Sequence, residues 1–321
     1  MGEKKRLLIT RRLPPEVESR AQQHYDVTLN HDDHVMEERE LVAATQSVDA
    51  ALICITEKFS PSVINALPDR FKIVSTFSVG TDHIDLTAAR ERGLRVGCAP
   101  YGVTIATAEI AMLLILGAAR RAPEGEMLVR RRAWTGWEPM QLLGRRLDGK
   151  RLGIFGMGKI GQALAQRARG FDMDIHYHSR RQLPEDLEKG AIYHETLDEL
   201  LSIADVLSVN APSSPTTRHI IDKTAIDKLP EGAIVVNTAR GDLINDDDLI
   251  AALKCGRLAY AGLDVFEGEL NINDAYYDLP NVFLLPHLGS AAWEARNQMG
   301  FEALDNIDAV FAGLEPPYPV V

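Results

Sequence analysis

The chain has 321 residues, of which 45% are hydrophobic and 25% charged, as in a soluble globular protein with two domains of roughly 100–200 residues each. Its formal net charge of −11 argues against a nucleic-acid surface, because phosphate binding needs clustered Lys and Arg side chains. Three widely spaced cysteines, Cys54, Cys98 and Cys255, support neither a disulfide framework nor a zinc site.

The first hundred residues alternate between short apolar runs and helical patterns. We expect strands at 7–9, 50–55, 72–75 and 94–96, and helices at 60–67 and 85–92. Continuous apolar runs separated by helices predict a parallel sheet that is covered on both faces. His31 and His34 stand beside two aspartates, which indicates an acidic surface turn rather than a metal site.

An Ala- and Leu-rich pattern at 104–121 predicts a buried helix, lying either between domains or against a partner subunit. Its apolar core, residues 110–119, is too short to span a bilayer, and the N-terminus lacks the apolar region of a signal peptide. We therefore expect a cytoplasmic protein that binds no membrane. The stretch that follows holds Trp134 and Trp137, which either line the cleft of a partner subunit or only pack in an interface.

From residue 151 onward, the sequence predicts a second series of six strands, which is the number found in a dinucleotide-binding sheet. These strands are expected at 152–155, 174–178, 206–210, 233–237, 259–265 and 282–285. A helical pattern at 291–312 then leads back to the first domain.

A glycine-rich loop follows the first strand of this series, with Lys159 and Ile160 between its last two glycines. Gly156 permits a tight turn, Gly158 lets the backbone approach a pyrophosphate, and Gly161 lets the next helix pack on the sheet. A ligand-free strand-to-helix turn is the plainer interpretation. The strand before the loop and the helix after it favour a nucleotide site.

The end of the next strand bears on the choice between NAD and NADP. NAD enzymes usually carry an acidic residue there, which binds the ribose hydroxyl. Here the residues are Ser179, Arg180 and Arg181, which offer a hydroxyl and cationic donors to a 2′-phosphate. A solvated basic loop is the alternative, but the missing acid favours NADP(H), with NAD(H) as a weaker cofactor.

Three separated residues form a candidate catalytic set: Arg240 in NTARG, Glu269 in LDVFEGE and His287 in LPHLGSA. The Arg can hold the carbonyl and carboxylate of a 2-oxo acid, while the His donates a proton and the Glu keeps the His protonated. Taken one at a time, Arg240 could lie in a plain turn, Glu269 could be a solvated acid and His287 could be a packing histidine. Their joint order behind a nucleotide loop favours catalysis.

Together with SVGTDHIDL at 78–86 and TAEIAM at 107–112, these stretches resemble the D-isomer-specific 2-hydroxyacid dehydrogenase family over nearly the whole chain. The segment WTGWEPMQLLGRRLDGK resembles the glyoxylate/hydroxypyruvate and 2-ketogluconate reductase branch. The resemblance implies an α/β homodimer with two doubly wound parallel-sheet domains. A Rossmann-type NADP-binding domain (101–287) would be inserted in a flavodoxin-like substrate domain (1–100 plus 288–321).

The resemblance also implies roles by position. The backbone N–H groups of Val79 and Gly80 would hold the substrate carboxylate together with Arg240. Further cofactor contacts are implied for Thr107, Pro212, Thr217, Thr238, Ala239, Asp264 and Gly289. One departure is that Glu269 is followed by Leu rather than Pro, and Glu267 competes with it for the acid role. The register from Arg240 favours Glu269.

The sequence thus predicts NADPH-dependent reduction of small 2-oxo acids to D-2-hydroxy acids. Glyoxylate and hydroxypyruvate are the first candidates, followed by 2-keto-D-gluconate. The alternatives are an NAD-preferring D-2-hydroxyacid dehydrogenase and a nucleotide-sensing protein similar to the corepressors of the family. No metal is expected to take part.

Overall fold

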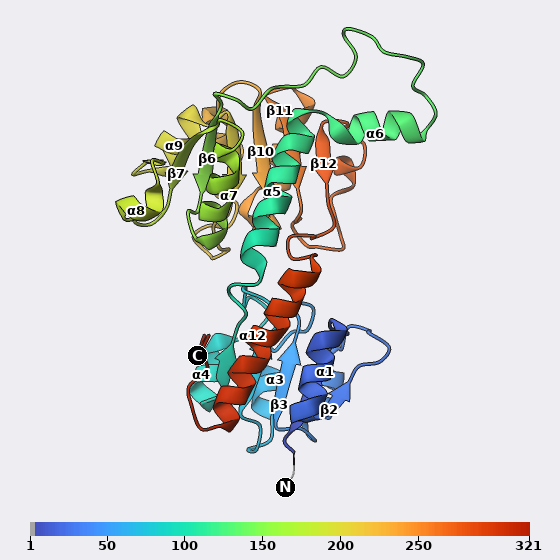
Figure 1. Cartoon of the computed structure of the whole chain (residues 1–321), viewed down its shortest axis with the longest axis vertical. Helices are drawn as coiled ribbons and strands as arrows, with labels where there is room; N and C mark the ends of the chain where they lie inside the picture. The colour runs from blue at the N-terminus through green and yellow to red at the C-terminus, as the bar shows by residue number, and fades with distance from the viewer. Residues whose placement is uncertain (1–3) are drawn as a thin grey trace. The chain divides into compact units, whose positions relative to one another are not determined.

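The computed structural model describes residues 4–321, which form two compact units (Figure 1). Unit 1 takes in the chain up to Thr104 and again from Ser290 to Val321, and unit 2 runs from Ile105 to Gly289. The boundaries expected from the sequence lay at 100/101 and 287/288. Unit 2 is therefore a continuous segment, whereas both ends of the chain contribute to unit 1.

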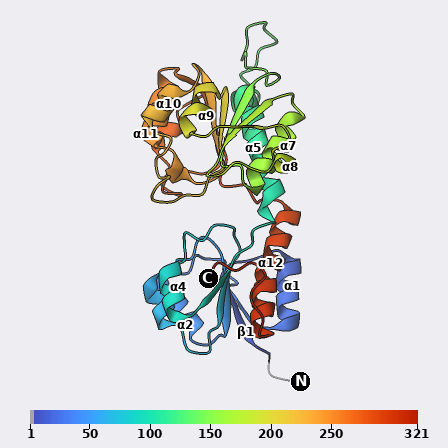
Figure 2. The same cartoon turned by 90° about the vertical axis from the view of Figure 1, so that its left-hand side faces the viewer.

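Unit 1 is a five-stranded parallel sheet with helices on both faces. Its strand order is β2-β1-β3-β4-β5, the flavodoxin-like order that was expected. The strands are β1 (Arg6–Ile9), β2 (Asp26–Leu29), β3 (Ala50–Ile53), β4 (Ile73–Thr76) and β5 (Arg95–Gly97). Figure 2 shows α1 (Pro15–His24) and α12 (Trp293–Phe311) on one face, and α2 (Glu38–Thr45) and α4 (Leu86–Arg92) on the other; α3 (Pro61–Ala66) packs in the same core as α2 and α4.

Local sequence explains these elements. Every residue of β3 and β4 is buried, as in a parallel sheet covered on both faces. Helix α4 begins where the carboxylate of Asp85 accepts the backbone N–H of Ala88, and it ends at Gly93, whose φ is +69°. Strand β2 was not predicted, because its sequence DVTL is half exposed and lacks an apolar run.

Unit 2 is a seven-stranded parallel sheet in the order β12-β11-β10-β9-β6-β7-β8. It is a doubly wound dinucleotide-binding sheet extended by one strand beyond β11. The strands are β6 (Arg151–Phe155), β7 (Asp174–His178), β8 (Ile192–Tyr193), β9 (Val206–Val209), β10 (Ala233–Asn237), β11 (Leu258–Leu263) and β12 (Val282–Leu284). The sequence predicted six of them and missed β8, which has only two residues and one buried neighbour, Ala191.

Two hydrophobic cores lie on the two faces of this sheet. One holds α5 (Val103–Ala119) and α7 (Lys159–Arg169), and the other holds α9 (Leu197–Ile203), α10 (Lys223–Lys228) and α11 (Asp246–Lys254), as Figure 2 shows. The remaining short elements are α8 (Glu185–Glu188) and the 3-10 helices η1 (Gly241–Leu243) and η2 (Asp274–Tyr276). The helix expected at 104–121 is confirmed as α5.

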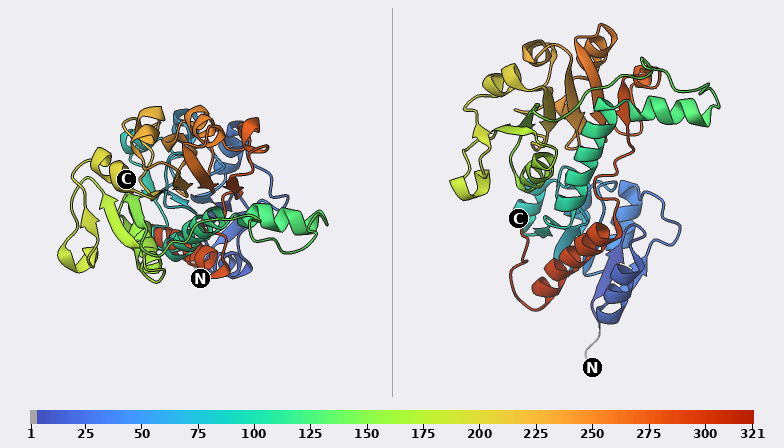
Figure 3. Two further views of the ribbon diagram at one scale, coloured as in Figure 1. Left: turned by 90° about the horizontal axis from the view of Figure 1, so that it is seen from above. Right: turned by 45° about the horizontal axis from the view of Figure 1, so that its top comes forward.

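Helix α6 (Ala122–Arg130) and the loop after it extend away from the sheet of unit 2 (Figure 3). Within residues 4–321, no single helix is long and apolar enough to cross a membrane, although α5 and α6, bent by 72°, pass that test as a pair. The α5 half of the pair packs in the core, where Leu114 and Ile115 are fully buried. Its apolar character therefore follows from its place in the fold.

Candidate functional site

The strand order of unit 2 reverses between β6 and β9, and the glycine-rich loop lies at this point. Gly156 has a φ of +99°, and a Cβ there would lie 2.6 Å from the backbone N of Ala211 in the loop after β9. A Cβ at Gly161 would lie 2.5 Å from the carbonyl oxygen of Gly156, so only glycine lets α7 pack this closely. At Gly158, in contrast, no atom lies within 4 Å of the Cβ position. The middle glycine therefore faces open space, as the pyrophosphate role requires.

Polar groups around this loop fit a dinucleotide. The residue before helix α7, Gly158, makes no side-chain cap hydrogen bond, and the positive end of the helix dipole lies at the loop. Among residues 4–321, Asn210 Oδ1 and Thr238 Oγ1 are buried without a hydrogen-bond partner, and they follow β9 and β10. Buried polar atoms of this kind call for a partner, and a nucleotide at the loop would provide one.

The residues after β7 also join the loop. Ser179 Oγ accepts the backbone N–H of Met157 at 2.7 Å, which fixes the glycine-rich loop against the end of the strand. Because a hydroxyl can accept and donate at once, Ser179 still has a proton to donate. Arg180 and Arg181 are exposed and form no ion pair within the described chain. No carboxylate stands at the end of β7.

The structure brings His287 and Glu269 together, with His287 Nδ1 2.9 Å from Glu269 Oε2. The competing carboxylate, Glu267, lies against other partners: its Oε2 is 2.8 Å from His219 Nε2, and its Oε1 accepts from Arg218 at 2.5 Å. The geometry therefore assigns Glu269, not Glu267, to His287. Because Nδ1 faces the carboxylate, Nε2 is the ring nitrogen that remains for a substrate.

Arg240 stands in the loop after β10 and is half buried. Asn237, only 1% exposed, shapes this loop: its Oδ1 accepts the N–H of Ala239 at 2.9 Å, and its Nδ2 donates to the carbonyl of Arg240 at 2.8 Å. A Cβ at Gly241 would lie 1.8 Å from the carbonyl carbon of Phe266. The Arg240 loop is therefore in backbone contact with the segment that leads from β11 to Glu269.

A buried carboxylate holds the loop that carries His287. Asp264 is fully buried, and its two oxygens accept the N–H groups of Leu288 at 2.6 Å and Gly289 at 2.8 Å. Its carbonyl accepts the N–H of His287, whose φ of +53° is rare for a residue other than glycine. Burial raises the pKa of Asp264, although the bond from Leu288 opposes the rise. Thr107 donates to the carbonyl of Gly289 at 3.1 Å.

The sequence did not predict this use of Asp264. The only signal was the spacing between the LDVFEGE and LPHLGSA stretches, and spacing alone does not show which backbone groups a buried carboxylate will meet. The structure shows Asp264 beside Thr107 and Gly289, two residues that the resemblance grouped with it.

Other residues singled out from the sequence lie in loops after strands. Thr217 Oγ1 donates to the carbonyl of Pro212 at 2.9 Å in the loop after β9 of unit 2. In unit 1, the loop after β4 presents Val79, which is 43% exposed, and Gly80, whose carbonyl accepts from Ser78 Oγ at 2.6 Å. Among the described residues, the N–H groups of Val79 and Gly80 have no acceptor.

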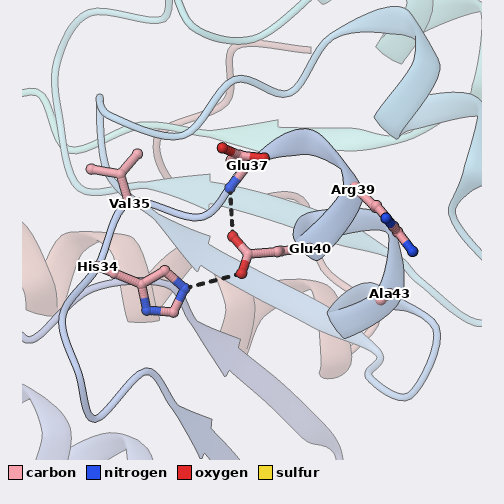
Figure 4. A pocket seen from close by; sticks show the side chains of 6 residues that line it. All are labelled: His34, Val35, Glu37, Arg39, Glu40 and Ala43. Carbon is pink, nitrogen blue, oxygen red and sulfur yellow. Dashed lines mark hydrogen bonds and ion pairs between the residues drawn. The ribbon is translucent and has the colours of Figure 1, made fainter.

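No group of three or more His, Cys, Asp or Glu side chains in residues 4–321 is placed to hold a metal ion. Asp33 pairs with Arg11 at 2.9 Å, and His34 Nε2 lies 3.4 Å from Glu40 Oε1. Figure 4 shows the shallow pocket around His34, where Glu40 also accepts the backbone N–H of Glu37 at 2.9 Å. This pocket is the capped start of α2.

Comparison with known proteins decides the family. The family model for D-isomer specific 2-hydroxyacid dehydrogenase, NAD binding domain, matches residues 112–289. The chain belongs to this family of oxidoreductases. The expected family is therefore confirmed.

Individual relatives and a solved structure support the family assignment over nearly the full length of the chain. The chain is 54% identical to the glycerate dehydrogenase of Hyphomicrobium methylovorum over 317 residues, 98% of each protein. It is 38% identical to the glyoxylate reductase of Thermococcus litoralis over 318 residues, 98% of this chain and 96% of the relative. The crystal structure of an NADPH-dependent glyoxylate/hydroxypyruvate reductase from Sinorhizobium meliloti, in complex with NADP and malonate, has a TM-score of 0.88 at 31% identity and covers 99% of this chain and 97% of its own.

Proposed function

We propose that the protein reduces small 2-oxo acids to D-2-hydroxy acids with NADPH. The observation that carries the proposal is the pair of His287 and Glu269 at the carboxyl ends of the same sheet that presents Arg240 and the open glycine-rich loop. Ligands of open α/β sheets bind at this edge. Glyoxylate and hydroxypyruvate are the first candidate substrates, and 2-keto-D-gluconate is the next.

In the proposed mechanism, NADPH held at the glycine-rich loop would supply a hydride to the carbonyl carbon of the substrate. Negative charge then develops on the carbonyl oxygen. The guanidinium of Arg240 stabilises this charge with charge-assisted hydrogen bonds. His287 donates a proton from Nε2, and Glu269 stabilises the imidazolium through Nδ1.

Binding of the substrate carboxylate is assigned to Arg240 and to the backbone N–H groups of Val79 and Gly80. Exposure of Val79 and the lack of acceptors for the two N–H groups support this assignment. Backbone N–H groups suit a carboxylate because they point the positive ends of their dipoles at it from fixed positions, without the mobility of a side chain.

The proposed cofactor contacts lie along the carboxyl edge of the sheet. The glycine-rich loop, with the N–H groups of Lys159 and Ile160, binds the pyrophosphate. Ser179, Arg180 and Arg181 bind the 2′-phosphate, and NAD(H) serves as a weaker cofactor. The nicotinamide half is assigned to Thr107, Pro212, Thr217, Thr238, Ala239, Asp264 and Gly289. The absence of an acid after β7 supports NADPH, as does the Sinorhizobium relative described as NADPH-dependent.

A second copy of the chain is the proposed protein partner, in a cytoplasmic homodimer. Helix α6 and the loop after it expose Val129, Trp134, Trp137 and Met140, of which Trp137 is 80% and Met140 is 76% exposed. Large apolar side chains gathered on one projecting segment are typical of an interface. A dimer in light scattering, and a monomer after Trp137→Ser with Met140→Ser, would support this assignment.

The chirality of the product tests the reaction directly. Hydroxypyruvate and NADPH should yield D-glycerate, identified by chiral chromatography, and His287→Gln should lower the yield at least about a hundredfold. An L product, or equal turnover by His287→Gln, would contradict the proposed function.

A further inference from the structure

One residue, His219, contacts both loops that carry candidate catalytic side chains. Its backbone N–H donates to the carbonyl of Asp242, 2.7 Å away and two residues beyond Arg240. Its ring Nε2 lies 2.8 Å from Oε2 of Glu267, two residues before Glu269. His219 therefore links the loop after β9 to the loops after β10 and β11.

Glu267 is held at both of its oxygens, by Arg218 at 2.5 Å and by His219 at 2.8 Å. Burial alone would raise the pKa of Glu267, but the hydrogen bonds from His219 and Arg218 outweigh burial and lower it. The carboxylate is therefore ionised at neutral pH and stays bound to its two partners.

The turn that carries Glu269 has little support of its own. Gly268 and Leu270 both have positive φ values, +65° and +80°, and the side chain of Leu270 is 97% exposed. The N–H of Asn271 closes the turn on the carbonyl of Gly268 at 2.9 Å. An exposed turn of this kind depends on its flanks for a fixed position, and Glu267 provides the flank on the N-terminal side.

The loop that carries Arg240 packs against the same segment, at residues 266–267. A Cβ at Gly241 would lie 1.8 Å from the carbonyl carbon of Phe266 and 2.2 Å from the backbone N of Glu267. The two backbones are thus in van der Waals contact. A displacement of Glu267 would move the neighbours of both Arg240 and Glu269.

The backbone of His219 itself is in a costly conformation, with a φ of +50°. Residues other than glycine adopt it rarely, and it persists where the surroundings fix it. Here the bonds of His219 to Asp242 and Glu267 do so. Strain kept beside a candidate site indicates a role in the arrangement of that site.

We propose that His219 is a positioning residue for the acid–base pair of His287 and Glu269. Its ring, through Glu267, fixes the turn that carries Glu269, and its backbone fixes the loop of Arg240. The inference rests on the proposed function, in which Glu269 keeps His287 protonated.

The NMR signal of the His287 Nδ1 proton in the full-length protein tests this inference without a substrate. A hydrogen bond to a carboxylate displaces such a signal downfield, so Glu269→Gln gives the reference, in which this displacement is lost. His219→Ala removes the link but no carboxylate, and it should lose part of the same displacement. With a 2-oxo acid, it should lower kcat more than it changes KM.

Arg218→Ala is the second variant, and it remains informative if His219→Ala fails to fold. Arg218 holds the other oxygen of Glu267, so its loss should weaken the same anchor and displace the His287 Nδ1 proton signal in the same direction as His219→Ala. An unchanged Nδ1 proton signal in both variants overturns the inference, even where the melting temperature falls.

His34→Ala is the matched control, because it removes an imidazole–glutamate pair in unit 1, with His34 3.4 Å from Glu40 (Figure 4). It should leave the His287 Nδ1 proton signal unchanged. Absence of turnover in the wild-type protein would contradict the proposed function, whereas the NMR signal would still decide the role of His219.

Discussion

Replacement of Gly158 by Ala distinguishes a conformational need for glycine at this position from the need to leave space for a bound pyrophosphate. No atom lies within 4 Å of the Cβ position, and a φ of −73° with a ψ of −164° is open to any residue. Replacing Gly by Ala at such a position stabilises the fold by about 0.4–1 kcal/mol, because the unfolded chain loses conformational freedom. Gly158→Ala should therefore fold at least as well as the wild type.

Binding of NADPH should nevertheless weaken. The added methyl group would stand where the pyrophosphate approaches the backbone, and it would displace at least one charge-assisted hydrogen bond worth about 1.5–3 kcal/mol. This loss corresponds to a Kd about ten to a hundred times higher. Calorimetric titration with NADPH and a thermal melt of the same sample measure both effects.

Gly125→Ala in α6 is the control, because its Cβ would meet only Leu142 Cδ1, at 3.7 Å. It should keep the wild-type Kd. Gly156→Ala should instead lower the melting temperature, since φ is +99° and Ala211 lies 2.6 Å from the new Cβ. A pyrophosphate site at Gly158 is contradicted if Gly158→Ala binds NADPH as tightly as the wild type, or if it loses stability as Gly156→Ala does.

Three further substitutions probe charge and pH. Arg240→Lys keeps the charge but loses the planar guanidinium, and it should lower kcat/KM on the order of a hundredfold with an unchanged melting temperature. A near-wild-type rate would contradict the proposed role of the guanidinium. Ser179→Asp keeps an acceptor for the N–H of Met157, 2.7 Å from Ser179 Oγ, but repels a 2′-phosphate, so kcat/KM should shift toward NADH by about tenfold or more. Burial lowers the pKa of His176 and His194 below the ordinary 6.5, and His176 Nδ1 lies 2.9 Å from His194 Nε2. The folded protein then takes up fewer protons than the unfolded chain, so stability is present above about pH 6.5 and falls below it. His194→Gln should lessen the fall in melting temperature between about pH 7 and about pH 5, and an equal fall would contradict the assignment.

The sequence predicted the parts of the fold that buried strands and glycine spacing encode. Both parallel sheets follow from buried runs such as β3 and the apolar part of β10, and the loop at Gly156 follows from a spacing that allows close packing. Strands β2 and β8 were missed because half-exposed edges carry little apolar signal. These edges form only because a neighbouring strand offers free backbone groups.

Within the site, the sequence predicted the catalytic set but left open whether Glu267 or Glu269 is the partner of His287. Their assignment depends on the turn at Gly268, which sends Glu267 toward His219 and Glu269 toward His287. Likewise, nothing in the spacing of the motifs shows that Asp264 meets Leu288 and its neighbour. Such contacts arise when loops after different strands meet at one edge of the sheet.

Reduction of 2-oxo acids with NADPH is best tested by the initial rate at which the near-ultraviolet absorbance of the reduced nicotinamide disappears. NADPH and NADH would be tried separately with glyoxylate, hydroxypyruvate and 2-ketogluconate. We expect turnover of at least one 2-oxo acid, with kcat/KM for NADPH well above that for NADH. A preference for NADH would contradict the role of Ser179, Arg180 and Arg181. Tight nucleotide binding without turnover of any of these acids would contradict the reductase and favour a nucleotide sensor.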